Sequence, residues 1–287
     1  DALMSQNATL RKILEAVYKM AVRKRKANES RPEGEKYAEL QRVRLGSRLL
    51  AYLPLRVTDE LVGILREFKE KASAIGVSQF YIQTHFQSPL EVTPEARHAI
   101  EAILAAGWTI TNQLVYTVSA SRKGHTAKLR QTLNALGVVC YYTFSVKGFL
   151  ENYAVYTPNS RSLQEAREEK IFGQVPEEKQ AELYDMIRNQ RPLGKRLVRF
   201  LKENGLLFAG TDRNVLNLPA IGKSMTFHTI GLTSEGKRIL KFDHDGSRRH
   251  SPIIDQMGEV YIVENKSVAA YLRQLKEMGE DVNEYRT

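Results

Sequence analysis

Polar side chains follow four apolar segments in the first half of the chain, where predicted strands would end. The clearest example is the apolar run Phe80-Tyr81-Ile82, which stops at a polar cluster over 83–87 that contains His85. Parallel sheets bind ligands at the carboxyl ends of their strands, so hydrogen-bonding groups there could hold a polar ligand. The polar residues at the four ends are Arg44 and Arg48, Gln83 and His85, Asn112 and Gln113, and Ser145 and Lys147. A lone loop histidine is as often a simple hydrogen-bonding residue, so the indication of a site comes from the four ends together.

The elements that would position these side chains alternate between strand and helix. Strands are predicted near residues 43, 80, 110 and 140, and the third, over 108–118, is interrupted at Asn112-Gln113. The predicted helices cover residues 7–26, 59–74, 94–106 and 125–136. Thr58 and Thr93-Pro94-Glu95 are typical helix starts, because a capping hydroxyl precedes a proline or an acid. This alternation predicts an α/β fold whose parallel strands are joined by right-handed crossovers, with the four strand ends on one rim.

The pattern changes after about residue 150. Residues 158–170 and 176–204 are predicted to be helical, the second with a break at Pro192-Leu193-Gly194, and a closing helix covers 267–278. Between them, short strands separated by turn residues are predicted over 206–209, 214–217, 225–232, 237–243 and 259–263. The predicted organisation is therefore a β/α domain over 1–150, a helical insertion over 151–204 and an α+β segment over 205–287.

Composition narrows the class of protein. The 287 residues are 42% hydrophobic, which is enough for one large or two ordinary domains. Cys140 is the only cysteine, so no intramolecular disulfide can form, and with no visible signal peptide or membrane span this favours a cytoplasmic protein. The net charge of +10 permits nucleic-acid binding through Arg23–Lys26 and Arg248-Arg249, but the positive charge is spread along the chain, which makes nucleic acid a secondary hypothesis.

Several motifs resemble the lysine 2,3-aminomutase family of radical S-adenosylmethionine (SAM) enzymes. Residues 44–48, R-L-G-S-R, are similar to the family's R-I-G-[ST]-R, and 84–93, T-H-F-Q-S-P-L-E-V-T, resemble its T-H-F-N-H-P-N-E-I-T. Asn112-Gln113 and Tyr141-Tyr142 resemble its N-Q-S strand and its paired tyrosines. Residues 218–223, L-P-A-I-G-K, are a weaker match to A-P-G-G-G-G-K. The likeness covers roughly 1–150, and 205–265 more loosely.

The resemblance implies a partial (β/α) TIM-like barrel of the radical SAM type with a C-terminal α+β extension. The implied cofactors are SAM, a [4Fe-4S] cluster and pyridoxal 5′-phosphate (PLP). Residues 1–5 read as the end of a strand and its loop, and Asp1 matches the aspartate of the family's G-G-D strand end, which makes it a candidate cofactor contact. One cysteine cannot hold such a cluster, so we expect the cluster ligands to lie outside this chain and Cys140 to be a core residue.

The family's functional residues carry over to particular positions. Lys223 matches the lysine that forms a Schiff base with PLP, although any single lysine is more often an exposed turn residue. His85 and Gln113 match SAM contacts, Arg48 is a further candidate on the same rim, and Tyr141 matches a residue that packs near PLP. The resemblance therefore implies Lys223 as the catalytic lysine and the other residues as cofactor contacts.

Substrate choice depends on two departures from the lysine enzymes. Lys147 and Asn217 stand where those enzymes place two aspartates that hold the substrate's terminal ammonium, and the family's glutamate 2,3-aminomutases carry this Lys/Asn pair. A lysine repels an ammonium but can bind a carboxylate. Alternatively, Lys147 is an ordinary loop lysine and an insertion over 158–190 has remodelled the pocket. The resemblance implies a 2,3-aminomutase whose substrate is a small molecule, an amino acid, with glutamate favoured over lysine. The alternative hypothesis for the function is a degenerate family member that serves as an interaction module. A homo-oligomer is a further expectation.

Overall fold

The computed structural model describes residues 1–146, 154–155, 157, 175–188, 193–209, 214–217, 226–243 and 259–285. The chain forms two compact units, each built from separate stretches of sequence. The first contains Asp1–Asn112, Arg130–Cys140 and Val175–Ala209, and the second contains Gln113–Leu129, Tyr141–Gln174 and Gly210–Thr287. Residues 175–209 thus share a unit with the first strands. The helix predicted over 158–170 lies outside the described residues, and the separate insertion over 151–204 stays a prediction.

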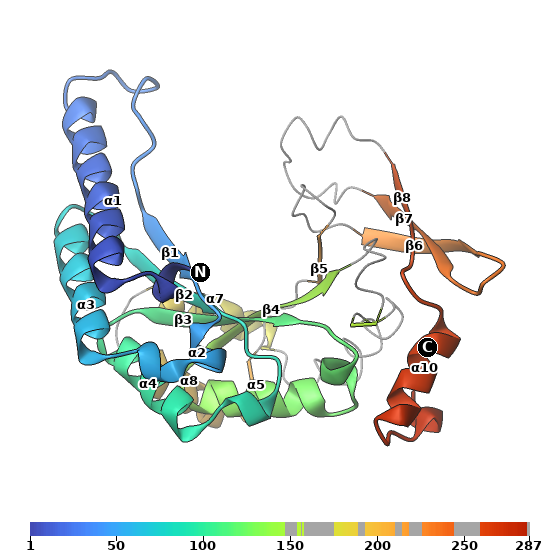
Figure 1. The fold of residues 1–287 in the computed structure, drawn as a ribbon. Helices are drawn as coiled ribbons and strands as arrows, with labels where there is room; N and C mark the ends of the chain where they lie inside the picture. The colour runs from blue at the N-terminus through green and yellow to red at the C-terminus, as the bar shows by residue number, and fades with distance from the viewer. Residues whose placement is uncertain are drawn as a thin grey trace. The chain divides into compact units, whose positions relative to one another are not determined.

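The larger sheet takes its first four strands from residues 1–146 and its fifth from farther along the chain (Figure 1). The five-stranded sheet has the order β1-β2-β3-β4-β5. Its strands are β1 (Arg42–Gly46), β2 (Gln79–Thr84), β3 (Thr109–Val115), β4 (Val139–Val146) and β5 (Asn214–Asn217). The β1–β2, β2–β3 and β4–β5 pairings are parallel, with Leu45 opposite Ile82 and Thr84 opposite Asn112. The mixed α/β class predicted from the alternating pattern is confirmed.

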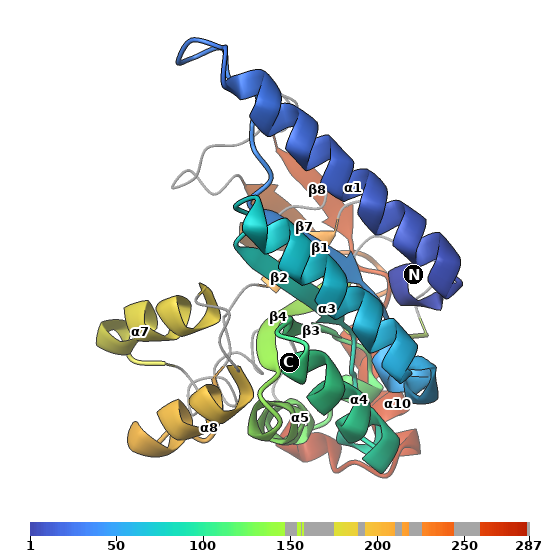
Figure 2. The same cartoon turned by 90° about the vertical axis from the view of Figure 1, so that its left-hand side faces the viewer.

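Helices connect the strands of the first unit. They are α1 (Asn7–Asn28), α2 (Leu49–Tyr52), α3 (Asp59–Ala74) and α4 (Pro94–Ala105). The Thr58 hydroxyl accepts a hydrogen bond from the Leu61 N–H at 3.3 Å, and the Thr93 hydroxyl accepts one from the Ala96 N–H at 3.2 Å. Both caps satisfy backbone donors that a helix start leaves unpaired, which confirms the two predicted starts. Figure 2 shows α1 and α3 running side by side.

An aromatic cluster fills the space between α3 and the sheet. The rings of Phe80 and Trp108 meet edge to face with centroids 5.5 Å apart, and Phe68 lies 6.1 Å from Phe80. The Trp108 indole N–H donates to the Leu65 carbonyl at 3.0 Å, so its one polar atom is satisfied inside the core. These contacts fix α3 against β2 and β3, whose ends carry the predicted site.

A second core lies in the same unit, where α7 (Glu177–Arg188) and α8 (Leu193–Glu203) pack on the start of β4. Its buried members are Val139, Val175, Leu183, Met186, Leu193, Leu197, Phe200, Leu201 and Ala209. Helix α8 presents its apolar residues to this core at helical spacing and leaves charged residues on the opposite side. Leu193 and Gly194, predicted to lie in a helix break, are the first residues of α8.

The second unit contains a three-stranded antiparallel sheet of β6 (Thr226–Leu232), β7 (Arg238–Asp243) and β8 (Val260–Val263). Helix α10 (Val268–Glu277) follows, with Ser267 as its N-cap. Tyr271 of α10 is fully buried, and its hydroxyl lies 2.8 Å from the Ser121 hydroxyl. Helix α5 (His125–Ala135) runs from this unit into the first. The strands predicted over 225–232, 237–243 and 259–263 are confirmed to within a residue.

Three further local predictions were wrong. Residues 2–4 form a short 3-10 helix rather than the end of a strand, because the Asp1 carboxylate accepts a hydrogen bond from the Leu3 N–H at 3.2 Å. Strand β3 passes through Asn112-Gln113 without interruption, and both side chains are buried. Residues 206–209 form no strand, and there the Ala209 N–H donates to the Asn134 side chain at 2.7 Å. Among the described residues, no helix has the length and apolar content needed to cross a bilayer.

Candidate functional site at the strand ends

The carboxyl end of β1 is tied to Asp1. The Ser47 hydroxyl donates to one Asp1 carboxylate oxygen at 2.6 Å, and the Arg48 backbone N–H donates to the other at 2.8 Å. The Ser47 N–H donates in turn to the Gln83 carbonyl at 2.9 Å, which links the ends of β1 and β2. The structure therefore brings Asp1 and Arg48 together, and the carboxylate holds the backbone at this strand end.

The Arg48 guanidinium is exposed and is oriented by a neighbouring tyrosine. It donates to the Tyr52 hydroxyl at 3.0 Å and lies 5.1 Å from the centre of that ring. This combination of a hydrogen bond and a cation–π contact stiffens a long side chain. Arg48 thus offers a fixed positive group at the end of β1, which suits an anionic part of a ligand.

Asn112 locks the loop that follows β2. Its side-chain oxygen accepts from the Phe86 N–H at 2.7 Å, and its side-chain nitrogen donates to the Phe86 carbonyl at 3.0 Å. Farther along the loop, the Glu91 carboxylate accepts from the Gln87 N–H at 2.7 Å and from the Ser88 N–H at 3.3 Å, and the second bond belongs to a capping box with Ser88. Both ends of the loop are therefore anchored, and the half-buried His85 sits between β2 and the first anchor.

Thr84 is the last residue of β2 and is fully buried. Its hydroxyl has no hydrogen-bond partner within the part of the chain that the structure describes. A buried hydroxyl normally finds a partner, so an unpaired one at a strand end fits a polar ligand such as SAM. His85 follows Thr84 directly, and buried Gln113 follows Asn112, the residue that pairs with Thr84 across the sheet. The sequence had indicated Asn112 only as one of the polar residues at the strand ends, and it assigned no separate role to Thr84.

The remaining predicted site residues lie in the less described part of the chain. Tyr141 belongs to β4 and Asn217 to β5, and these strands pair in parallel with Val146 opposite Asn217. The structure describes the backbone of both residues but not their side chains. Lys147 and Lys223 lie outside the described residues. The roles assigned to these four residues stay predictions.

Cys140 does not fit a role as an iron–sulfur ligand. Its thiol is buried in β4, where desolvation raises the pKa to about 12, and the Asn134 amide nitrogen lies 3.7 Å from its sulfur. A ligand to iron must be a thiolate, and burial in this apolar strand disfavours that charged form. The prediction that Cys140 is a core residue is confirmed. Within the described ranges, no cluster of three or more His, Cys, Asp or Glu residues could hold a metal ion.

We expect Cys140 to resist thiol reagents in the folded protein. With a pKa of about 12, only about one thiol in ten thousand is ionised at pH 8, and burial blocks the reagent as well. The measurement is the rate of reaction with a chromogenic disulfide before and after unfolding in guanidinium. The variant Ser30→Cys is the positive control, because Ser30 is exposed and should react at once. Rapid labelling of Cys140 in the native protein would contradict this burial.

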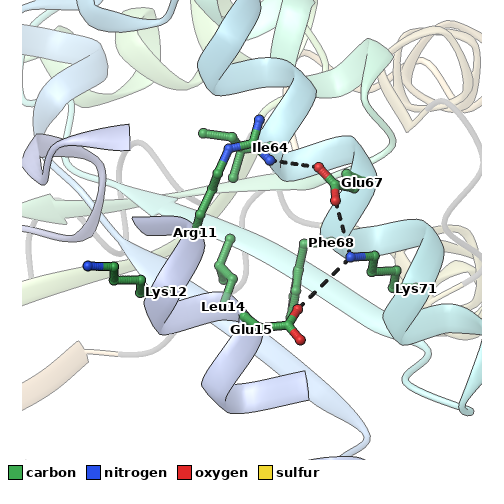
Figure 3. Close-up of a pocket in the computed structure, with 8 residues that line it drawn as sticks. All are labelled: Arg11, Lys12, Leu14, Glu15, Ile64, Glu67, Phe68 and Lys71. Atoms are coloured by element: carbon green, nitrogen blue, oxygen red, sulfur yellow. Dashed lines mark hydrogen bonds and ion pairs between the residues drawn. The ribbon is translucent and has the colours of Figure 1, made fainter. Parts of the chain in front are cut away.

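A groove with a volume of about 310 Å³ lies between α1 and α3 (Figure 3). Its floor is formed by Leu14, Ile64 and Phe68. Charged side chains cross it in pairs: Arg11 reaches Glu67 at 2.7 Å, and Lys71 reaches Glu67 at 3.1 Å and Glu15 at 4.0 Å. The hydrogen bonds from Arg11 and Lys71 lower the pKa of Glu67. Because these charges already pair with one another, the groove is a seam between two helices and not a ligand site.

Comparison with known proteins points to one family. The chain is 28% identical over 250 residues to an uncharacterized KamA family protein from Methanocaldococcus jannaschii, covering 85% of this chain and 33% of that protein. The chain is thus similar to a KamA family protein over most of its own length. A putative L-lysine 2,3-aminomutase from Aquifex aeolicus is 34% identical over 119 residues, which cover 40% of this chain and 31% of that protein. No protein-family model matches the chain.

The similar proteins include enzymes named for two substrates. A glutamate 2,3-aminomutase from Clostridioides difficile is 34% identical over 106 residues, which cover 37% of this chain and 23% of that protein. The chain therefore spans about a third or less of the length of these similar proteins. The resemblance to the lysine 2,3-aminomutase family that the strand-end motifs indicated is confirmed.

Proposed function

We propose that this chain works in a radical SAM, PLP-dependent amino acid 2,3-aminomutase. The observation that carries the proposal is the relationship to the KamA family across 85% of the chain. The structure adds support, since the motif begins at Thr84, the last residue of β2, and continues into a loop that Asn112 of the next strand holds at Phe86. The parallel order β1-β2-β3-β4-β5 is also what a segment of a (β/α) barrel would have.

The residues at the ends of β1 and β2 would hold SAM. We assign this role to Asp1, Arg48, Thr84 and His85, with Gln113 from β3. When bound in this family, SAM supplies the radical that removes a hydrogen atom from the substrate. The chain's own part is to orient the ligand: Asn112 fixes the loop that carries His85, and Asp1 fixes the backbone at Arg48. Cys140 does not fit a [4Fe-4S] cluster, so in this proposal the cluster ligands lie outside the chain.

Lys223 would attach PLP. A lysine must lose its proton before its amine can react with an aldehyde, and the preceding Gly222 leaves room for a planar ring. PLP, when bound, would hold the substrate's amino group while it moves between C2 and C3. Tyr141 of β4 is assigned to the surroundings of the PLP ring. Among the described lysines, Lys266 is the strongest alternative for attaching PLP, because it is buried and desolvation lowers its pKa to about 8.

Borohydride reduction of the PLP-loaded enzyme, followed by peptide mapping, is expected to place the label on Lys223. Lys223→Ala should abolish labelling and activity together. Lys266→Met is the matched control, since it removes the lysine with the lowered pKa and should leave the label in place. A label found on Lys266 or on any other lysine would remove Lys223 from the proposed mechanism.

A further inference from the structure

A second groove on the first unit lies where α8 meets α4 and the C-terminal end of α5. Helix α8 is held close there by Gly194, which packs directly on the backbone of Gly137. Gly137 has a positive φ of 86°, and a Cβ atom on it would collide with Gly194. Position 137 must therefore be glycine for this contact to form. The contact sets the position of α8 relative to the helices beside it.

The groove has a volume of about 750 Å³ and an apolar floor. The floor is formed by Leu104, Ala105, Ala135, Leu136 and Val198. Val198 is 41% exposed, although the other apolar residues of α8 face the buried core on the opposite side. An exposed β-branched residue beside a concave apolar floor is typical of a surface that binds another protein.

Cations line this groove along α8. Lys195, Arg199 and Lys202 are exposed and recur at i, i+4 and i+7, so they form one row that spans about 10 Å along the helix. Among the described residues, no side chain of these three makes a hydrogen bond or an ion pair. Glu101 is the one acidic residue among the described residues that line the groove. The contrast with the α1–α3 groove is informative, because the charges of that groove neutralise one another (Figure 3).

We propose that the α4–α5–α8 groove is a docking site for an acidic amphipathic helix of a partner protein. The partner's apolar ridge would lie on the floor beside Val198, and its carboxylates would pair with Lys195, Arg199 and Lys202. A helix repeats its side chains with the same spacing as α8, so one partner helix can meet all three cations. Nucleic acid fits less well, because an apolar floor offers nothing to a phosphate backbone.

The test uses a fluorescein-labelled model helix of about 18 residues, long enough to be helical, with leucines at i, i+4 and i+7 and glutamates beside them. Fluorescence anisotropy should show saturable binding to the intact chain that weakens with added salt. The triple variant Lys195→Glu/Arg199→Glu/Lys202→Glu should weaken binding at least about tenfold, which corresponds to about 1.4 kcal/mol. Val198→Asp should weaken it as well, because it places a charge on the apolar floor.

The matched control is Lys12→Glu/Arg23→Glu/Lys26→Glu, which makes the same change in net charge at exposed positions of α1. It should bind the peptide as the unchanged chain does, and a scrambled peptide of the same composition should not bind. Equal losses in both triple variants would show a general charge effect and overturn the proposal. So would no binding by the unchanged chain, or tighter binding of duplex DNA or of phosphatidylserine vesicles at the same three cations.

Discussion

Replacing Asn112 with alanine is expected to lower the free energy of unfolding by about 2–4 kcal/mol. The Asn112 side chain is buried and pairs with both backbone polar groups of Phe86, at 2.7 and 3.0 Å. Its removal leaves a buried N–H and a buried carbonyl without partners, and each such group costs about 1–3 kcal/mol. Chemical denaturation followed by far-ultraviolet circular dichroism measures this change.

Asn134 provides the matched control for Asn112. It is equally buried and also bonds backbone groups, accepting from the Ala209 N–H at 2.7 Å and donating to the Val138 carbonyl at 2.8 Å. Asn134→Ala should therefore cost similar stability. Only Asn112→Ala should also weaken SAM binding by the complete enzyme in calorimetry, because Asn112 holds the loop of His85. If Asn112→Ala is as stable as the parent chain, the loop does not depend on this clamp. Equal SAM affinities in the two variants would make Asn112 purely structural.

Local signals predicted the regular elements well. Helix α3 occupies the predicted residues 59–74, and Thr58 caps it as expected, because a capping hydroxyl and a first-turn acid act over only a few residues. Helix α4 ends before Gly107, whose φ of 83° is a conformation that glycine adopts without strain. The strand-and-helix alternation then allowed few arrangements other than parallel pairing.

Contacts between distant residues could not be read from the sequence. Asn112 was predicted to interrupt a strand, because a polar pair inside an apolar run is typical of a break. Its partner, Phe86, is 26 residues away, and only folding shows that the amide is satisfied inside the sheet. The strand prediction over 206–209 was wrong for a related reason. The Asn134 side chain, which accepts a hydrogen bond from the Ala209 N–H, lies 75 residues away in the sequence. Tertiary hydrogen bonds of this kind override local propensity.

The candidate site rests in part on strand ends and in part on resemblance. The structure brings Asp1, Ser47 and Arg48 together at the end of β1, and the roles assigned to the site residues stay predictions. Thr84 was missed because its importance lies in a buried hydroxyl without a partner, which is a property of packing. Lys223 and Lys147 were chosen by matching motifs, and their roles can be tested only by chemistry.

The proposed aminomutase is expected to favour glutamate over lysine by at least about 100-fold in kcat/KM. The reason is the proposed placement of Lys147 and Asn217 where the lysine enzymes carry two aspartates. Leaving a buried charge mispaired costs about 3–5 kcal/mol, and a 100-fold preference needs only about 2.7 kcal/mol. The backbone of Asn217 lies in β5 opposite Val146, the residue before Lys147, so the pairing of β4 and β5 is compatible with joint action. Turnover of each amino acid by the cofactor-reconstituted enzyme measures the preference.

The double variant Lys147→Asp/Asn217→Asp tests whether these residues set that preference. It replaces one positive charge by two negative ones, so glutamate turnover should fall and lysine turnover should rise. Lys128→Asp is the control for a simple change of surface charge, since Lys128 lies on α5 and has no assigned part in the site. It should leave the ratio of the two substrates unchanged. Faster conversion of lysine by the unchanged enzyme would show that Lys147 and Asn217 do not contact the substrate's side chain. A glutamate preference that survives the double variant would mean that other residues bind the carboxylate.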